Sequence, residues 1–120
     1  MGKVTNNFPK KTYFCLINLY AMKITIVSGA RPNFMKIAPI TRAIKAAQEA
    51  GKKISYRLVY TGRQDDTSLD ASLFSDLDMK RPDGYLGVTG HDHSEVAAAI
   101  MLAFEKELNN HPAQVVLVVD

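Results

Sequence analysis

The feature that most constrains the fold is an alternation between short apolar runs and longer segments with helical periodicity. The apolar runs are "KITIVS" at 23–28, "ISYRLVY" at 54–60 and "AQVVLVV" at 113–119. Apolar strands that alternate with helices are typical of a parallel sheet covered by helices on both faces. Because parallel crossover connections are right-handed, the pattern predicts a doubly wound, Rossmann-like α/β domain.

Three further segments carry apolar side chains at helical spacing and predict helices. They span 34–51, 66–79 and 94–110, and the first ends at Gly51, a residue typical of helix ends. The stretch "RPDGYLGV" at 81–88 predicts a turn followed by a short extended piece. No repeat, linker or low-complexity tract interrupts this order.

Length and composition exclude several classes of protein. The chain has 120 residues, which fits one domain with one core. Its 47% hydrophobic content is not that of a disordered chain, and a scattered net charge of +3 does not indicate nucleic-acid binding. Cys15 is the only cysteine, so no disulfide can form within the chain, as suits a reducing compartment. The apolar stretches are too short for a transmembrane helix.

Residues 1–21, "MGKVTNNFPKKTYFCLINLYA", are interpreted as an N-terminal extension outside the core. Two lysines before an apolar stretch imitate a signal peptide, but Asn18 interrupts the apolar part. We favour Met22 as the natural start and expect the extension to be poorly ordered or loosely docked. The domain is then 22–120. We expect it to be an incomplete first part of a larger protein, because the sequence stops at the carboxyl end of a buried strand, where ligand sites form.

The first candidate site is the corner "SGARPNFMK", residues 28–36, between the first strand and the first helix. Gly29 lets the backbone approach a ligand closely, and Arg31 and Lys36 bring two cations to a helix start without an acid. A helix N-terminus carries partial positive charge and free N–H groups, so the corner favours an incoming phosphate or diphosphate. The alternative is an ordinary corner with solvated cations. Neither a G-x-G-x-x-G fingerprint nor a Walker A loop is present.

A second candidate is "TGRQDD" at 61–66, where the second strand ends. Arg63 and Gln64 lie at the carboxyl end of that strand, from which side chains reach ligands in doubly wound sheets. A solvated loop is the alternative for Arg63. Asp65 and Asp66 are interpreted as loop charges or helix caps.

The pair His91 and His93 raises the question of a metal site. Asp92, followed three residues later by Glu95, is a capping-box pattern that explains this stretch more simply. We therefore expect a helix start here and no metal.

These motifs together resemble the non-hydrolysing UDP-N-acetylglucosamine 2-epimerases. "MKITIVSGARPNFMKIAPITRAI" resembles the family's opening strand and "G-T-R-P-E-A-I-K-M-A-P" motif, with Ala30 in place of Thr and Asn33 in place of Glu. "VYTGRQDD" resembles the family's "TGQH" segment, with Arg63 and Gln64 in place of Gln and His. "LDMKRPDGYLGV" resembles "RPDYNLGV", and "HSEVAAAIMLAFEKEL" with "PAQVVLVV" resembles the elements before the family's "GD" motif. The resemblance runs in one order from Met22 to Asp120.

The resemblance implies an enzyme of two Rossmann-like domains, as in glycosyltransferase-B folds, with the active site in the cleft between them. It implies interconversion of UDP-N-acetylglucosamine and UDP-N-acetylmannosamine, through removal of the C2 proton, elimination of UDP and its re-addition. It also implies that no nicotinamide, metal or other cofactor is used. The enzyme would be a cytoplasmic homodimer of polysaccharide biosynthesis, with a UDP-sugar as its partner and neither nucleic acid nor membrane.

The same resemblance assigns Lys36 and Asp120 to catalysis. Counting from Pro112 places Asp120 on the family's functional Asp, whereas counting from "VVLV" places it on the preceding Gly. A strand-end acid or a helix cap is the alternative for this residue. The predicted substrate contacts are Gly29, Arg31, Lys36, Arg63 and Gln64. The replaced Gln–His pair leaves open the regulation by a second UDP-sugar that some bacterial members show.

Two other functions are kept open. One is a hydrolysing epimerase or a UDP-sugar glycosyltransferase of the same architecture, because the residues that separate these enzymes lie mostly beyond position 120. The other is a non-catalytic module that binds a nucleotide sugar. A flavodoxin-like receiver domain is one example of a non-catalytic module. It would need paired acids after the first strand, where "SGARP" stands instead, so this example is disfavoured. Because the family's second domain holds most uridine contacts, we expect residues 1–120 alone to have no epimerase activity.

Overall fold

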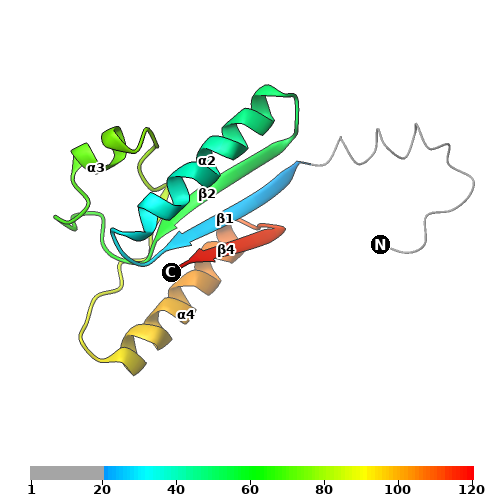
Figure 1. Ribbon diagram of the computed structural model, residues 1–120. Coiled ribbons are helices and arrows are strands. Elements are labelled where there is room, and N and C mark those ends of the chain that lie inside the picture. Colours follow the sequence, from blue (N-terminus) through cyan, green and yellow to red (C-terminus); the bar gives the residue numbers. More distant parts are fainter. Residues whose placement is uncertain (1–20) are drawn as a thin grey trace, which may run out of the picture.

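The computed structural model describes residues 21–120 (Figure 1). Its elements are β1 (Met22–Ser28), α2 (Asn33–Glu49), β2 (Ile54–Tyr60), α3 (Ala71–Asp76), β3 (Gly84–Tyr85), α4 (His93–Asn110) and β4 (Val115–Val119). Apart from Ala21, the segment interpreted as an N-terminal extension lies outside the described residues. No helix in the described range has the length and apolar character needed to cross a membrane.

The four strands form one sheet in the order β3-β2-β1-β4, and every pairing is parallel. Ser28, the last residue of β1, pairs with Tyr60 of β2 on one side and with Val119 of β4 on the other. Three strands therefore end in a row, at what we call the carboxyl edge. The loops that follow these strands are brought together there.

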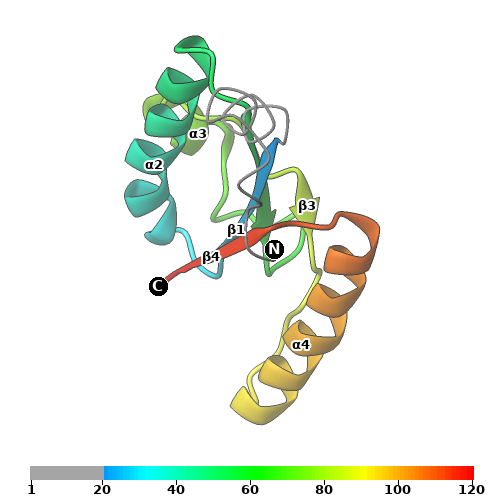
Figure 2. The same cartoon turned by 90° about the vertical axis from the view of Figure 1, so that its right-hand side faces the viewer.

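Helices lie on both faces of the sheet, with α2 on one face and α4 on the other (Figure 2). The α2 face holds the core, in which Ile26, Phe34, Ile37 and Leu58 are fully buried. Their removal from water is the main stabilising contribution to the fold. The prediction of a doubly wound, Rossmann-like sheet is confirmed.

The α4 face is covered less completely. Helix α4 has no buried residue, and Met101 and Leu102 are 73% and 68% exposed. An ion pair joins the helix to β2: Arg57 Nε lies 2.7 Å from Glu107 Oε2, and Nη2 lies 3.2 Å from Oε1. The Glu107 side chain is only 9% exposed, so a charged, two-point contact anchors a helix whose apolar contacts are few.

The helix predicted over 66–79 is wrong in length, because only Ala71–Asp76 is helical. Asp66 Oδ1 accepts from the backbone N–H of Ser68 at 2.9 Å, and Asp70 caps the shorter helix from outside it. Polar side chains that bond to nearby backbone groups compete with helix formation. The periodic apolar residues still reach the core, namely Leu69, Leu73 and Phe74.

The other predicted elements agree with the structure in type and place, and β2 does so residue for residue. The prediction that the last strand is buried is wrong, because β4 lies at the edge of the sheet and its Val118 is 69% exposed. Gly51 has a φ of +89°, in the region that favours glycine, so it ends α2 as predicted. The turn and short extended piece predicted over 81–88 contain β3.

Candidate functional site

The corner between β1 and α2 is built by short-range backbone bonds. β1 ends at Ser28, whose Oγ donates to the carbonyl of Ala30 at 3.2 Å. Helix α2 begins after Pro32, with no side-chain cap and no acid in its first turn. The backbone N–H groups of residues 33–35 donate to the carbonyls of residues 30–32 at 3.1–3.2 Å. The predicted free N–H donors are thus engaged within the turn, and the two cationic side chains remain to attract an anion.

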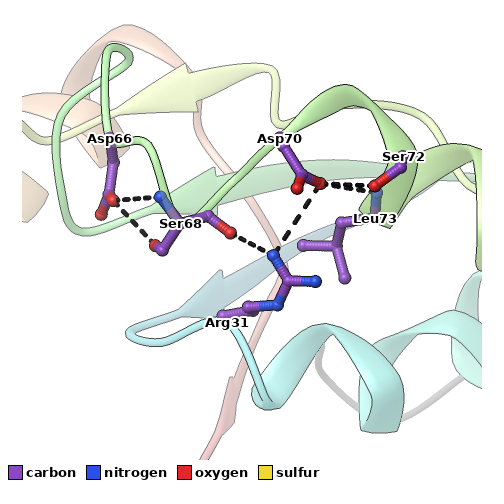
Figure 3. Close-up of polar contacts among 6 residues, drawn as sticks. All are labelled: Arg31, Asp66, Ser68, Asp70, Ser72 and Leu73. Carbon is purple, nitrogen blue, oxygen red and sulfur yellow. Dashed lines mark hydrogen bonds and ion pairs between the residues drawn. The ribbon is translucent and has the colours of Figure 1, made fainter.

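Arg31 is held by the loop that follows β2 (Figure 3). Its Nη1 donates to the backbone oxygen of Ser68 at 2.5 Å and lies 3.8 Å from Asp70 Oδ1. The prediction that this corner lacks a counter-charge is therefore wrong for Arg31, because tertiary structure supplies an acid from another loop. Both side chains of the ion pair are about half exposed, so solvent screening keeps the pair weak.

Lys36 has a different partner. Its exposed Nζ donates to the backbone oxygen of Asp120, which follows β4. The structure brings Lys36 and Asp120 together at the carboxyl edge, through the backbone of Asp120. A catalytic role for either residue stays a prediction.

A cleft of about 270 Å³ opens at the carboxyl edge, between the strand ends and the first turns of α4. We call it the carboxyl-edge cleft. Its walls include Gly29, Tyr60, Thr61, Arg63, Gly90 and Ile100. Of the predicted substrate contacts, Gly29 and Arg63 therefore line the cleft. Arg31 and Lys36 lie on the same edge but outside the cleft walls.

Two glycines at this edge differ in whether the surrounding structure leaves room for a side chain. A Cβ on Gly62 would lie 2.6 Å from Cε2 of Tyr60, so the loop can close over that ring only with glycine. A Cβ on Gly29 would meet its nearest neighbour, Thr61 Oγ1, at an ordinary 3.8 Å. The protein itself does not require glycine at position 29, and the close approach of a ligand there stays a prediction.

Arg63 and Gln64 follow Gly62 on the outer part of the loop. Arg63 forms a two-point ion pair with Asp65, with Nε–Oδ1 at 2.9 Å and Nη2–Oδ2 at 3.0 Å. The two side chains are 60% and 70% exposed, so the pair contributes little stability and can be exchanged for a ligand. Gln64 is exposed beside them, and its contact with substrate stays a prediction.

Tyr60 and Asp66 form a polar pair that the sequence interpretation did not identify as part of the site. Tyr60 Oη donates to Asp66 Oδ2 at 2.7 Å, while Asp66 Oδ1 accepts from the backbone N–H and Oγ of Ser68 at 2.9 and 2.7 Å. Burial, followed by the contact with Asp66, raises the pKa of Tyr60 to about 12. The bonds from Tyr60 and Ser68 lower the pKa of Asp66. The signal available in the sequence for the contact between Asp66 and Ser68 was the "DTS" pattern at 66–68, which is typical of an Asx turn.

A larger hollow lies elsewhere, between α2 and the segment that follows α3. This α2/α3 groove has a volume of about 610 Å³ and is lined by side chains that include Arg42, Lys45, Tyr56 and Lys80. Lys80 Nζ lies 2.9 Å from Asp83 Oδ2 and 4.3 Å from the centre of the Tyr56 ring. Since Tyr56 belongs to the first half of β2, the groove lies away from the carboxyl edge.

The stretch with His91 and His93 starts α4. Asp92 is its N-cap and accepts from the backbone N–H of Ser94 at 2.9 Å, so the predicted helix start is confirmed. The bond goes to Ser94 and not, as a capping box would require, to Glu95. Within residues 21–120, no three His, Cys, Asp or Glu side chains are placed to hold a metal ion together.

A doubly wound parallel sheet with polar loops at its carboxyl edge defines a Rossmann-like domain, a class whose ligands bind at that edge. Within this class, the chain is similar to the UDP-N-acetylglucosamine 2-epimerases. It is 27% identical over 97 residues to the UDP-N-acetylglucosamine 2-epimerase of Methanocaldococcus jannaschii, covering 81% of this chain and 25% of that protein. No protein-family model matches the chain.

Two further comparisons agree. The UDP-2,3-diacetamido-2,3-dideoxy-D-glucuronate 2-epimerase of Pseudomonas aeruginosa is 30% identical over 84 residues, which are 70% of this chain and 23% of that protein. The crystal structure of the M. jannaschii enzyme in complex with UDP-GlcNAc and UDP matches with a TM-score of 0.66, over 81% of this chain and 25% of that one. The chain spans about a quarter of the length of these relatives. The resemblance to this family of epimerases is confirmed in sequence and in fold.

Proposed function

We propose that this chain forms part of a UDP-N-acetylglucosamine 2-epimerase that interconverts UDP-GlcNAc and UDP-ManNAc without net hydrolysis. The observation that carries the proposal is the position of Arg31 and Lys36, at the edge where β1, β2 and β4 end. The similarity to the M. jannaschii enzyme, whose crystal structure contains UDP-GlcNAc and UDP, supports a UDP-sugar as the ligand.

In this proposal, the two cations stabilise the departing diphosphate. The C2 proton of the sugar is removed as the bond between C1 and UDP breaks, and negative charge develops on UDP. Lys36 is suited to this charge because its exposed ammonium is a compact positive charge. Arg31 offers a planar guanidinium fork that fits phosphate oxygens.

The other site residues act on the sugar or at the rim of the site. The carboxylate of Asp120 takes part in proton transfer at C2, which a positioned acid or base accelerates. Arg63 leaves its exposed partner Asp65 to contact the ligand, with Gln64 beside it. Re-addition of UDP, with a proton delivered to the opposite face of C2, gives the epimer. No cofactor takes part in this scheme.

The proposal extends to the whole protein. Residues 22–120 form an incomplete part of the first of two Rossmann-like domains in a glycosyltransferase-B arrangement. The complete enzyme is a cytoplasmic homodimer of polysaccharide biosynthesis. The chain of 120 residues is inactive by itself, because most uridine contacts lie on the second domain and further catalytic acids and a His lie beyond position 120.

A second candidate is a related epimerase that acts on another UDP-sugar with a 2-acetamido group. The 30% identity to the P. aeruginosa UDP-2,3-diacetamido-2,3-dideoxy-D-glucuronate 2-epimerase favours it. The reaction class is unchanged, and only the contacts to the sugar ring differ.

The product formed from UDP-GlcNAc tests this function. Proton NMR would follow the conversion of UDP-GlcNAc and, in separate samples, of its diacetamido-glucuronate counterpart. Each substrate would be mixed with the chain alone and with the chain joined to the remaining three quarters of the M. jannaschii enzyme. We expect no turnover by the chain alone and UDP-ManNAc from the joined protein. Free N-acetylmannosamine would show a hydrolysing enzyme instead, and turnover by the chain alone would contradict the proposed inactivity.

A further inference from the structure

The loop that holds Arg31 is itself fixed by hydrogen bonds of its own side chains. Arg31 Nη1 donates to the backbone oxygen of Ser68, so the position of that carbonyl sets the position of the guanidinium. Two aspartates flank Ser68 in the sequence, Asp66 before it and Asp70 after it (Figure 3). The question is what each aspartate contributes.

Asp70 fixes the far side of the loop. Its Oδ1 accepts from the backbone N–H of Leu73 at 3.0 Å and from Ser72 Oγ at 2.8 Å, which is the N-cap of α3. It also forms the weak ion pair with Arg31 at 3.8 Å. Asp70 therefore acts on Arg31 both directly and through the helix start.

Asp66 fixes the near side and acts only through Ser68. It receives the backbone N–H and the hydroxyl of Ser68 on one carboxylate oxygen, and the hydroxyl of Tyr60 on the other. Tyr60 is the last residue of β2 and is 5% exposed, with its ring 5.9 Å from that of Phe34. A chain of hydrogen bonds thus runs from the core through Tyr60, Asp66 and Ser68 to Arg31.

We propose that Tyr60 and Asp66 are positioning residues for Arg31, which hold its guanidinium in the orientation that receives the diphosphate of a nucleotide sugar. The inference rests on the proposed function for its ligand. A long arginine side chain loses rotamer freedom on binding, and a fixed acceptor for Nη1 removes part of that cost beforehand. Because only Nη1 makes these contacts within residues 21–120, Nε and Nη2 remain for the phosphate oxygens.

A double-mutant cycle tests this coupling. UDP would be titrated by NMR into the protein, into Asp66→Asn, into Arg31→Ala and into the double variant, while the Nε–H resonance of Arg31 is followed wherever Arg31 is present. For the Arg31 resonance, Asp65→Asn is the matched control, because it removes the same charge from the same loop but breaks only the exposed pair with Arg63. Tyr60→Phe and Ser68→Ala each delete one hydroxyl and serve as milder variants if Asp66→Asn does not fold.

We expect Arg31→Ala to weaken UDP binding about tenfold, as for the loss of a charged hydrogen bond. Asp66→Asn is expected to weaken binding about threefold in the natural background and to have almost no effect once Arg31 is gone. It should also shift the Nε–H resonance of Arg31 in the absence of ligand, whereas Asp65→Asn should not.

The same data separate a failure of the positioning role of Asp66 from a failure of the proposed ligand. If Asp66→Asn weakens binding equally in both backgrounds and leaves the Arg31 resonance unchanged, Asp66 only stabilises the fold and the inference is wrong. If UDP binds neither to the chain nor to the chain joined to the remaining three quarters of the M. jannaschii enzyme, the proposed ligand is wrong. The Arg31 resonance in the ligand-free variants alone then decides whether Asp66 positions the guanidinium.

Discussion

The carboxyl-edge cleft and the α2/α3 groove are two hollows of the same small domain, and they contrast in size and in position. The groove is larger, at about 610 Å³ against about 270 Å³, and three basic side chains line it, Arg42, Lys45 and Lys80. The cleft lies where β1 and β2 end, beside Arg31 and Lys36. Only the smaller hollow lies at the strand ends, where ligands bind in doubly wound sheets.

The contrast has a structural reason. At the carboxyl edge, the strands are followed by long polar loops. The loop 61–70 contains both Asp66, which binds Tyr60, and Ser68, which binds Arg31. At the other edge, α2 joins β2 through the short connection 50–53. In the proposed function, volume and number of cations therefore do not indicate the site. The direction of the strands does, because the loops that follow parallel strands meet at one edge of the sheet.

The largest expected effect concerns the core that the two hollows share. The ring of Phe34 is fully buried and lies 5.9 Å from that of Tyr60, beside the cleft, and 5.2 Å from that of Phe74, beside the groove. Phe34→Ala should lower the free energy of unfolding by about 3–5 kcal/mol in urea titration, because it leaves a cavity. Met35→Ala, at a position 59% exposed, should change it by less than about 0.5 kcal/mol. Equal effects would mean that α2 does not pack as described.

The next effect separates the two hollows by charge. Lys36→Ala should weaken UDP-GlcNAc binding about tenfold in calorimetric or NMR titration, because a charged contact to phosphate is lost. Lys45→Ala removes the same charge from the same helix, at the groove, and should change the affinity by less than about twofold. A greater loss from Lys45→Ala would place the anion site in the groove.

A smaller effect concerns the cap between the two hollows. Asp70→Ala removes the N-cap of α3, whose Leu73 and Phe74 belong to the core. The thermal unfolding midpoint should fall by about 4 °C, as is typical for a lost cap in a domain of this size. Asp76→Ala, an exposed position at the other end of α3, should leave the midpoint nearly unchanged. If both variants unfold at the natural midpoint, the cap does not contribute to stability.

The smallest effect is a dependence on alkaline pH. The folded protein raises the pKa of Tyr60 from 10 to about 12, through burial and the bond to Asp66. The fold thus favours the neutral phenol, and this stabilisation is complete below pH 10 and lost as the pH rises through about 12. Tyr60→Phe should lower the free energy of unfolding by about 0.5 kcal/mol at neutral pH. Between pH 10 and 12, this variant should lose stability less steeply than the natural protein. Phenolate absorbance should also show a lower Tyr60 pKa in Asp66→Asn than in Asp65→Asn, and equal titrations would contradict the hydrogen bond.

The sequence was sufficient to predict the strands, because the apolar runs at 23–28, 54–60 and 113–119 have no equally good alternative. It did not predict that β4 is an exposed edge strand, since burial depends on what packs against the strand. It also placed the candidate residues at the carboxyl edge, since parallel strands bring their following loops to one edge. The helix over 66–79 was predicted from apolar spacing alone, and the Asp66 and Asp70 side chains shorten it by binding local N–H groups.

The partners of the site could not be predicted in the same way. Arg31 and Ser68 are 37 residues apart, and Arg57 and Glu107 are 50 apart, so only the packed fold brings them together. No periodicity in the sequence encodes such pairs. This is why the corner was expected to lack a counter-charge, whereas the folded chain places Asp70 beside Arg31.

The measurement that tests the central claim most directly is an NMR map of where UDP-GlcNAc binds. The backbone amide shifts of residues 21–120 would be followed as the ligand is added. We predict that the largest shifts fall on residues 29–36 and 61–64, at the carboxyl edge, and that Arg42, Lys45 and Lys80 show none beyond the effect of added salt. Shifts centred on the α2/α3 groove, with the carboxyl edge unchanged, would contradict the account.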